Sequence, residues 1–244
     1  MKILSWDIGI KNLSYCFLEK KDNDILIKDW NIINLEDEIP VSICNAKCKN
    51  GNNCSSKSVF FSKDKKIGYC RTHYKKLENL KDYKEKKKVK KKKEDLINIG
   101  SKLINELNNR FDNTLELDNV LLENQPSLKN PTMKSIQMII YSYFLINGYT
   151  IEPKYIKHIQ MISATQKNKF CNEYCKTNDT IEKPKTKSSY NNAKKLAILV
   201  TQDILEKKQF NNINPSDYID FFKENKKKDD LADSYLQGLQ YLLK

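Results

Sequence analysis

Four acidic side chains in three separated segments are spaced so that one folded site can hold them all. Asp7 ends the segment KILSWD and Glu123 ends NVLLE, and each follows mostly apolar residues typical of a buried strand. Asp230 and Asp233 are three residues apart in KKKDDLADSYLQ, so a helix would carry both on one face. Carboxylates in a core are costly unless positive charge lies among them, and hard divalent cations take oxygen ligands. We therefore expect a Mg²⁺ or Mn²⁺ site of the two-ion type that hydrolyses phosphodiesters.

Each acid also has an ordinary explanation when it is taken alone. Acids at strand ends are common, and Asp230 and Asp233 suit the start of a helix because its N-terminus carries partial positive charge. Asp229 is adjacent and acidic, and it ranks behind these two as a ligand. The combination of four acids favours the cation site. Gly9, two residues after Asp7, would let the backbone approach a ligand closely.

The elements that must position these acids follow from the apolar periodicity. Three strands joined by turns predict an antiparallel meander, and later segments predict alternating helices and strands. This order is typical of an α/β fold with a mixed sheet flanked by helices. The polar segment 176–189 is expected to be a loop. The expected strands are 2–7, 13–19, 25–33, 120–123 and 149–152, and the expected helices are 96–111, 132–147 with Thr132 as its N-cap, 191–208 and 228–243.

The last expected helix has two different faces. One arc is apolar, and the opposite arc carries Asp230, Asp233, Gln237 and Gln240. The helix is therefore expected to pack on the sheet and to place both carboxylates at the edge of that sheet. The apolar arc consists of Leu231, Ala232, Tyr235, Leu236, Leu239, Leu242 and Leu243.

Four of the seven cysteines fall in one short stretch, together with a histidine. Cys44-x9-Cys54 and Cys70-x2-His73 supply three thiolates and an imidazole, which can close a tetrahedral Zn²⁺ site. Cys48 is the spare thiol, although a Cys44–Cys48 pairing, or Cys48 in place of Cys44, stays open. Without a secretory signal, metal binding is favoured over disulfides, and reduced free thiols are the alternative. Residues 40–80 are therefore expected to form a zinc-binding insertion, with a structural ion whose four protein ligands leave no position for catalysis.

The balance of charge is strongly basic. The 244 residues include 44 Lys and Arg against 31 Asp and Glu, a net charge of +13. This suits a polyanionic partner such as nucleic acid, although an AT-rich genome would also favour lysine codons. The run KEKKKVKKKK at Lys84–Lys93 is either a DNA contact or a solvated stretch, and 81–93 is assigned as a lysine-rich linker. No apolar run is long enough to span a bilayer, so we expect a soluble, intracellular protein.

The acidic motifs resemble those of a known family. WDIGIKNLSYC, LLENQP and KKDDLADSYLQ, in this order, are similar to the acidic motifs of RuvC-type Holliday junction resolvases, and the similarity is closest to the poxvirus and giant-virus branch. These proteins belong to the ribonuclease-H-like superfamily. The resemblance implies that residues 1–39 and 94–244 form a mixed five-stranded sheet flanked by helices. The insertion at 40–80 is a departure, because bacterial members lack it.

The resemblance also implies an activity. It implies a homodimer that cuts four-way DNA junctions by paired symmetric nicks during recombination or replication, at sites of viral DNA replication if the source is viral. Asp7, Glu123, Asp230 and Asp233 would then hold Mg²⁺ or Mn²⁺. The candidate DNA contacts are Lys11, Lys129, Lys194 and Lys195. Two alternatives stay open: a ribonuclease-H-like nuclease for other branched or hybrid substrates, and a non-catalytic nucleic-acid-binding protein.

Overall fold

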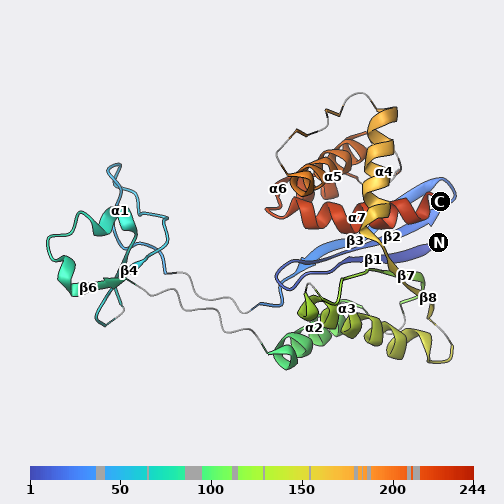
Figure 1. Ribbon diagram of the computed structural model, residues 1–244, viewed down its shortest axis with the longest axis horizontal. Coiled ribbons are helices and arrows are strands. Elements are labelled where there is room, and N and C mark those ends of the chain that lie inside the picture. The colour runs from blue at the N-terminus through green and yellow to red at the C-terminus, as the bar shows by residue number, and fades with distance from the viewer. Residues whose placement is uncertain are drawn as a thin grey trace. The chain divides into compact units, whose positions relative to one another are not determined.

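A computed structural model presents the chain as two compact units, one of Met1–Glu36 with Asp95–Lys244 and the other of Asp37–Glu94 (Figure 1). Within the part of the chain that is described, no helix combines the length and apolar character needed to cross a membrane. The described residues are 1–36, 42–64, 66–85, 95–111, 115–128, 130–153, 155–178, 181–182, 184–185, 188–207, 210 and 215–244.

A mixed five-stranded sheet forms the centre of the larger unit, as expected, with the strand order β3-β2-β1-β7-β8. β1, β2 and β3 form the antiparallel meander, whereas β7 runs parallel to β1 and β8 runs parallel to β7. Because the carboxyl ends of β1 and β7 lie at one edge of the sheet, Asp7 and Glu123 become neighbours. The strands are β1 (Lys2–Asp7), β2 (Leu13–Lys21), β3 (Asp24–Ile33), β7 (Leu117–Glu123) and β8 (Ile156–Ile162).

Helices cover both faces of this sheet (Figure 1). Alternation along the strands divides the core, because Ile3 and Cys16 pack toward the α7 side while Trp6 and Tyr15 pack toward α2 and α3. The helices on the first side are α4 (Ala164–Thr177), α5 (Ser189–Glu206), α6 (Pro215–Glu224) and α7 (Lys228–Leu242). Those on the second side are α2 (Leu96–Arg110) and α3 (Pro131–Phe144), and a π-helical turn at Leu145–Tyr149 follows α3.

Several expected elements differ from the structure. Asn130, not Thr132, caps α3, because its side chain accepts from the Met133 amide, and Pro131 then occupies the first turn. The strand expected at 149–152 is wrong: the π-helical turn extends to Tyr149, and the fifth strand is β8 at Ile156–Ile162. β8 lies at the sheet edge, where half of its side chains face solvent, so its sequence IKHIQMI has no continuous apolar run. Helices α4 and α6 were also not expected.

The last helix is more deeply enclosed than its two-faced sequence predicted. Gln237, assigned to the polar arc, is buried and donates from Nε2 to the Trp6 carbonyl at 3.2 Å. Ser234 Oγ lies 2.8 Å from Ser14 Oγ, which anchors α7 to β2. Gly238 permits close packing, since an added Cβ would lie 2.9 Å from Leu18 Cδ1 and 3.1 Å from Ser5 Cβ. These contacts fix α7 along the sheet with its first turns beside Asp7.

The smaller unit is a three-stranded sheet with short helical turns and hardly any apolar core. Its strand order is β5-β4-β6, and its buried hydrophobic cluster consists of three cysteines. β6 contains Lys84 and pairs with β4, so this unit continues past residue 80 into the segment expected to be linker. Residues 86–93 of the lysine run lie outside the described residues. Its elements are β4 (Phe60–Ser62), β5 (Gly68–Tyr69), α1 (Arg71–Tyr74), a 3₁₀ turn (Leu80–Asp82) and β6 (Tyr83–Glu85).

Candidate active site

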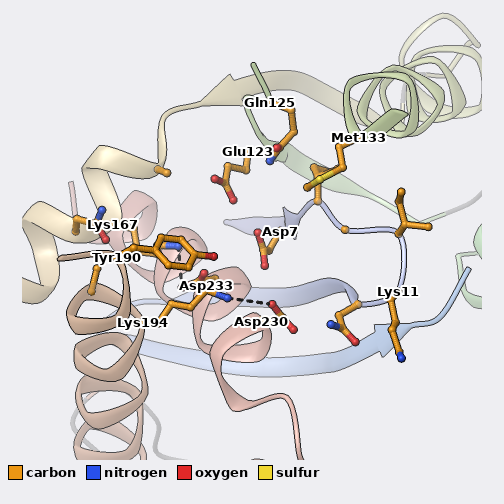
Figure 2. A pocket seen from close by; sticks show the side chains of 17 residues that line it. Asp7, Lys11, Glu123, Gln125, Met133, Lys167, Tyr190, Lys194, Asp230 and Asp233 are labelled. Atoms are coloured by element: carbon orange, nitrogen blue, oxygen red, sulfur yellow. Dashed lines mark ion pairs between the residues drawn. The ribbon is translucent and has the colours of Figure 1, made fainter. Parts of the chain in front are cut away.

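A pocket of about 440 Å³ collects all four expected acids at the edge of the larger sheet (Figure 2). Asp7 and Glu123 enter it from the ends of β1 and β7, and Asp230 and Asp233 enter from the first turns of α7. The three segments that carry these acids are far apart in sequence. The parallel pairing of β1 with β7 and the anchoring of α7 against β1 therefore assemble the pocket.

The turn after β1 closes tightly onto its own backbone. A Cβ at Gly9 would clash with the carbonyl of Asn12, so glycine is needed there. Gly9 also lines the pocket, and the expected close approach of a ligand to its backbone stays a prediction. The turn brings Lys11 and Asn12 to the rim of the same pocket as Asp7.

Burial has the largest effect on the pKa values of the carboxyl groups in the pocket, and repulsion among these groups adds to it. Enclosure raises the pKa of Asp7 well above its ordinary value, and its hydrogen bond with Glu123 and the charge of Asp233 act in the same direction. Burial also raises the pKa of Asp233, despite the opposing effect of Lys167. Burial and the charge of Asp229 raise the pKa of Asp230 to about 6. The site thus has more negative charge than its surroundings neutralise.

Lys167 is the basic residue most tightly integrated with these acids. It lies in the first turn of α4, its side chain is 8% exposed, and its Nζ is 2.7 Å from Asp233 Oδ1. Burial lowers the pKa of Lys167, but the negative charges of Asp233 and Asp7 outweigh burial and leave its pKa raised. A buried ammonium therefore stands beside the carboxylates.

Lys194 forms a second ion pair at the opening of the pocket. Its Nζ lies 2.6 Å from Asp229 Oδ2 and 3.9 Å from Asp230 Oδ1. It also lies 5.2 Å from the ring centroid of Tyr190, whose side chain lines the pocket and is largely exposed. Asp229 is thus engaged by a lysine, which agrees with its lower rank as a ligand.

The donor set fits a hard divalent cation. All four expected ligands are carboxylates, and the buried Oδ2 of Asp230 accepts no hydrogen bond from the described residues. Burying a carboxylate oxygen without a partner is unfavourable in free energy, unless a cation binds it or a hydrogen-bond donor contacts it. No three of these carboxylates lie close enough together to surround one ion, within the described chain.

The expected DNA-contact lysines have separate positions. Lys11 and Lys194 line the acidic pocket. Lys195, which is exposed on α5, lines a different hollow together with Leu199, so it does not join the acids. Lys129 lies outside the described residues.

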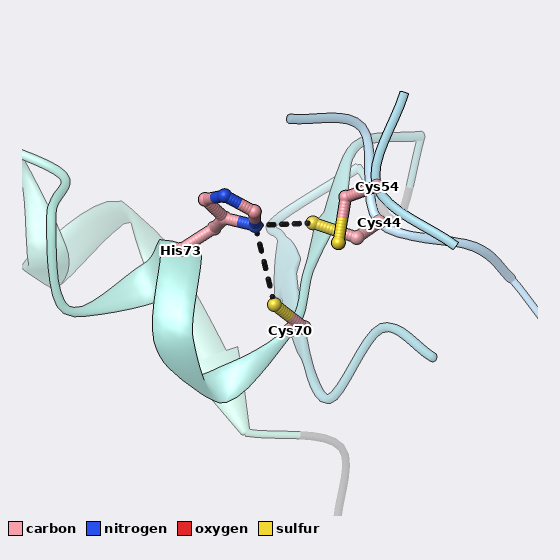
Figure 3. A group of neighbouring side chains, drawn as sticks. All are labelled: Cys44, Cys54, Cys70 and His73. Carbon is pink, nitrogen blue, oxygen red and sulfur yellow. Dashed lines mark hydrogen bonds between the residues drawn. The ribbon is translucent and has the colours of Figure 1, made fainter. Parts of the chain in front are cut away.

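The smaller unit holds a second group of potential metal ligands (Figure 3). One ligand atom from each of Cys44, Cys54, Cys70 and His73 lies within 4.8 Å of the others. His73 Nδ1 is 3.5 Å from Cys44 Sγ and 3.3 Å from Cys70 Sγ. Cys48 is half-buried beside this set and outside it. The four side chains offer the thiolate and imidazole donors that a tetrahedral zinc site uses.

The fold and the acidic pocket define the class: a mixed α/β sheet with carboxylates at the ends of two neighbouring parallel strands. The family described as mitochondrial resolvase Ydc2 / RNA splicing MRS1 matches residues 3–127, more than half of the chain. The chain belongs to this family, in which the junction-resolving nucleases are structure-specific endonucleases.

Individual relatives agree with this membership. An uncharacterized protein of Acanthamoeba polyphaga mimivirus is 29% identical, over 99% of this chain and 74% of the relative. The yeast mitochondrial Holliday junction resolvase Ydc2 has a TM-score of 0.54 at 15% identity, covering 98% of this chain and 78% of that one. The fowlpox virus resolvase, solved with its substrate Holliday junction DNA, has a TM-score of 0.50 at 19% identity over the whole of both chains. At these identities, the two structures support the fold.

Sequence reasoning missed Lys167 and Tyr190. The segment around Lys167 is polar, so helix α4 has weak apolar periodicity and was not recognised. Ser163 caps this helix by accepting from the Thr165 amide, and this serine, a residue type favoured at the N-cap, was the available signal. Tyr190 lies just after a serine cap in the same way, since Ser188 accepts from Asn191.

Proposed function

We propose that this protein is a metal-dependent endonuclease that resolves four-way DNA junctions by paired nicks. The observation that carries the proposal is the convergence of Asp7, Glu123, Asp230 and Asp233 in one pocket of a resolvase-family chain. The net charge of +13 suits a DNA substrate, because basic side chains neutralise phosphates. A role in viral DNA replication or recombination is proposed on the mimivirus relative.

The chain's own residues prepare the site for hydrolysis. The four carboxylates would hold Mg²⁺ or Mn²⁺, which when bound supplies Lewis-acid chemistry for activating water and stabilising the leaving oxygen. Asp7 and Glu123 extend from two hydrogen-bonded strands, so their spacing is set by the sheet. Lys167 orients Asp233 through their 2.7 Å ion pair. Lys11 and Tyr190 at the pocket lining are placed to meet the DNA strand.

Cleavage of a labelled immobile four-way junction tests this proposal. Wild type with Mg²⁺ is expected to make paired symmetric nicks, and Asp7→Asn is expected to lose them by a factor of at least about 10³. Junction binding by Asp7→Asn should persist, because affinity rests largely on the basic surface. Full cleavage by Asp7→Asn would refute the assigned site. Equal cutting of linear duplex or RNA–DNA hybrid would keep the nuclease and reject the junction as its substrate.

We propose a homodimer as the working form, since paired nicks require two sites. The face of α2 and α3 away from the sheet supports this proposal, because several of its large apolar side chains are exposed. Ile97 on α2 is 73% exposed, and Ile146, in the π-helical turn that follows α3, is 61% exposed. Ile104 and Met138 line a shallow groove between the two helices. Light scattering should give a mass of twice the chain, and Ile104→Glu with Met138→Glu should give the monomer.

We further propose that Cys44, Cys54, Cys70 and His73 hold one structural Zn²⁺. The smaller unit needs a bound ion to stabilise its fold, because its buried hydrophobic cluster contains only the three cysteines among the described residues. Four protein ligands would leave no open position for water, so this ion would not take part in hydrolysis.

A second function is worth testing because the family description includes an RNA-splicing protein. Under this alternative, the chain would bind nucleic acid without cutting it. The four acids at the pocket argue against it, since a chain without catalysis has no need to enclose them. Junction or RNA binding without cleavage under Mg²⁺ and Mn²⁺ would favour the second function.

A further inference from the structure

The smaller unit carries a concentrated positive charge that the nuclease pocket does not explain. Its described residues, 42–64 and 66–85, include ten Lys and Arg against four Asp and Glu, and all ten basic side chains are exposed. The excess is uneven, because three of the four acids lie between residues 78 and 85. Between residues 42 and 76, Asp64 is the only acid described.

Most of these basic side chains form no ion pair among the described residues of the unit. Arg71 pairs with Glu85 at 3.0 Å, and Lys63 lies 3.8 Å from Asp82. Asp64 is already engaged by the Ser62 hydroxyl and the Lys66 amide. Among the described residues, no ion pair involves the knuckle lysines, our name for Lys47, Lys49, Lys75 and Lys76.

The knuckle lysines are held on ordered backbone next to the cysteine cluster. Lys47 and Lys49 flank Cys48 in a tight turn, in which the Cys48 amide donates to the Asn52 carbonyl at 2.8 Å and Gly51 has a φ of 81°. Lys75 and Lys76 follow α1, which begins directly after Cys70 and carries His73. Lys76 also lies near enough to Cys48 for its charge to act on that thiol. Two segments distant in sequence thus carry lysines next to residues of the same cysteine cluster.

The surface suits a polyanion better than an apolar partner. The large apolar side chains exposed in the described part of this unit are Ile43, Ile67 and Leu80, at scattered positions in the sequence. Lysines on a preorganised scaffold lose less entropy on binding than lysines on a mobile chain. Each such lysine that meets a DNA phosphate releases counterions and adds affinity without reading sequence.

We infer that the smaller unit is a second DNA-binding surface, whose knuckle lysines hold the phosphate backbone of a duplex arm. This inference extends the proposed function to a second surface. It depends on the proposed function only in taking DNA, and not another polyanion, as the ligand. Its role is affinity, whereas cutting belongs to the acidic pocket of the larger unit. The knuckle lysines should therefore affect binding and not the rate of cleavage on saturating junction.

The salt dependence of binding tests this inference in the full-length, zinc-loaded chain. An Asp7→Asn background keeps the junction intact, and the four knuckle lysines are changed to Gln together. The slope of log affinity on log salt should fall by about 0.9 for each DNA phosphate that the variant no longer neutralises. Affinity at about 0.1 M salt should fall at least about tenfold. Restoring charge with Arg at the same four positions should recover both values.

A control variant with the same loss of charge distinguishes an effect of these four positions from an effect of the protein's net charge. The control changes four lysines of the larger unit to Gln, at positions away from the pocket end of its strands: Lys2, Lys21, Lys28 and Lys157. Its slope should stay close to that of the background protein. One zinc per chain in both variants shows that the smaller unit is intact.

Three results would overturn the inference. These are an unchanged slope in the knuckle variant, an equal decrease in the control, and retained duplex DNA binding with loss of RNA or acidic-protein binding. The proposed function is judged separately, by cleavage with the wild type. A wild type that cuts no junction while the knuckle variant loses DNA affinity would reject the nuclease and keep the DNA-binding surface.

Discussion

Lys167 Nζ lies 2.7 Å from Asp233 Oδ1, and the two side chains are only 8% and 14% exposed. This ion pair joins α4 to α7 inside a pocket whose other acids repel one another. Removing one partner of a buried ion pair leaves the other charge without compensation, which destabilises a protein strongly. The lysine therefore acts as a resident cation of the acidic pocket.

Replacing Lys167 with Met should destabilise the metal-free protein strongly. Asp233 would be left buried without its partner, which costs about 3–5 kcal/mol for pairs of this kind. Urea unfolding with and without Mg²⁺ measures the effect, and Mg²⁺ should recover part of the loss. Lys169→Met on the same helix is the control, because Lys169 is 79% exposed and should change the unfolding free energy little. Equal effects of the two changes would contradict the resident-cation role.

The stability of the metal-free protein should fall as the pH rises through the titration of Asp230. The pKa of Asp230 is raised from 3.8 to about 6, so the folded state holds this proton more tightly than the unfolded state does. The unfolding free energy therefore decreases from about pH 4 to above pH 6, the reverse of an ion-paired acid. The Asp230 contribution should be on the order of 1 kcal/mol, since solvent screens part of it.

Denaturation curves at pH 5 and pH 7.5, conditions chosen to bracket about pH 6, measure that fall. Asp230→Asn should reduce the fall by the Asp230 contribution, because the amide does not titrate, and Asp7 and Asp233 with their raised pKa values account for the rest. Saturating Mg²⁺ should also offset the fall by binding the ionised carboxylates. A metal-free stability that rises over this interval, with Asp230→Asn identical to wild type, would contradict the assignment.

Two cysteine substitutions should differ in their effect on zinc. Cys70→Ser removes one of the four clustered ligands and should abolish stoichiometric zinc while leaving the larger unit folded. Cys48→Ser should retain one zinc per chain, because Cys48 lies outside that set. Metal analysis of the purified proteins, with circular dichroism for the fold, checks both results. The opposite pattern would make Cys48 a ligand.

Two helical glycines should respond oppositely to alanine. At Gly238, the new Cβ would lie 2.9 Å from Leu18 Cδ1 and 3.1 Å from Ser5 Cβ, so the helix must move from the sheet. We expect Gly238→Ala to cost about 1–3 kcal/mol. At Gly100, the nearest atom is the flexible end of Ile139 at 3.3 Å, so a gain of up to about 1 kcal/mol in helix propensity should dominate. Thermal unfolding of the pair measures the difference, and equal changes would refute the packing argument.

The sequence predicted the parts of this fold that obey simple periodicity. β1, β2 and β3 are mostly apolar segments bounded by turn residues, and Asp7 at the end of β1 was recognisable for that reason. Helix α4 was not predicted, because polar residues interrupt its apolar pattern. One of these residues is Lys167, which faces the acids. Strand β8 was not predicted, because a strand at the sheet edge does not need two apolar faces. The partners of individual charges, such as Asp229 with Lys194, depend on tertiary packing that local sequence does not encode.

Because of Lys167, the two units differ in whether folding comes before or after metal binding. The larger unit contains its own counter-charge for Asp233, so its chain can reach the native fold before magnesium arrives. The smaller unit has no comparable substitute among its described residues, where three thiols and an imidazole face one another. With the proposed Zn²⁺ as its ligand, the folding of this unit would follow zinc delivery. Within one polypeptide, magnesium supply would set when the enzyme works, and zinc supply would set when its second unit is complete.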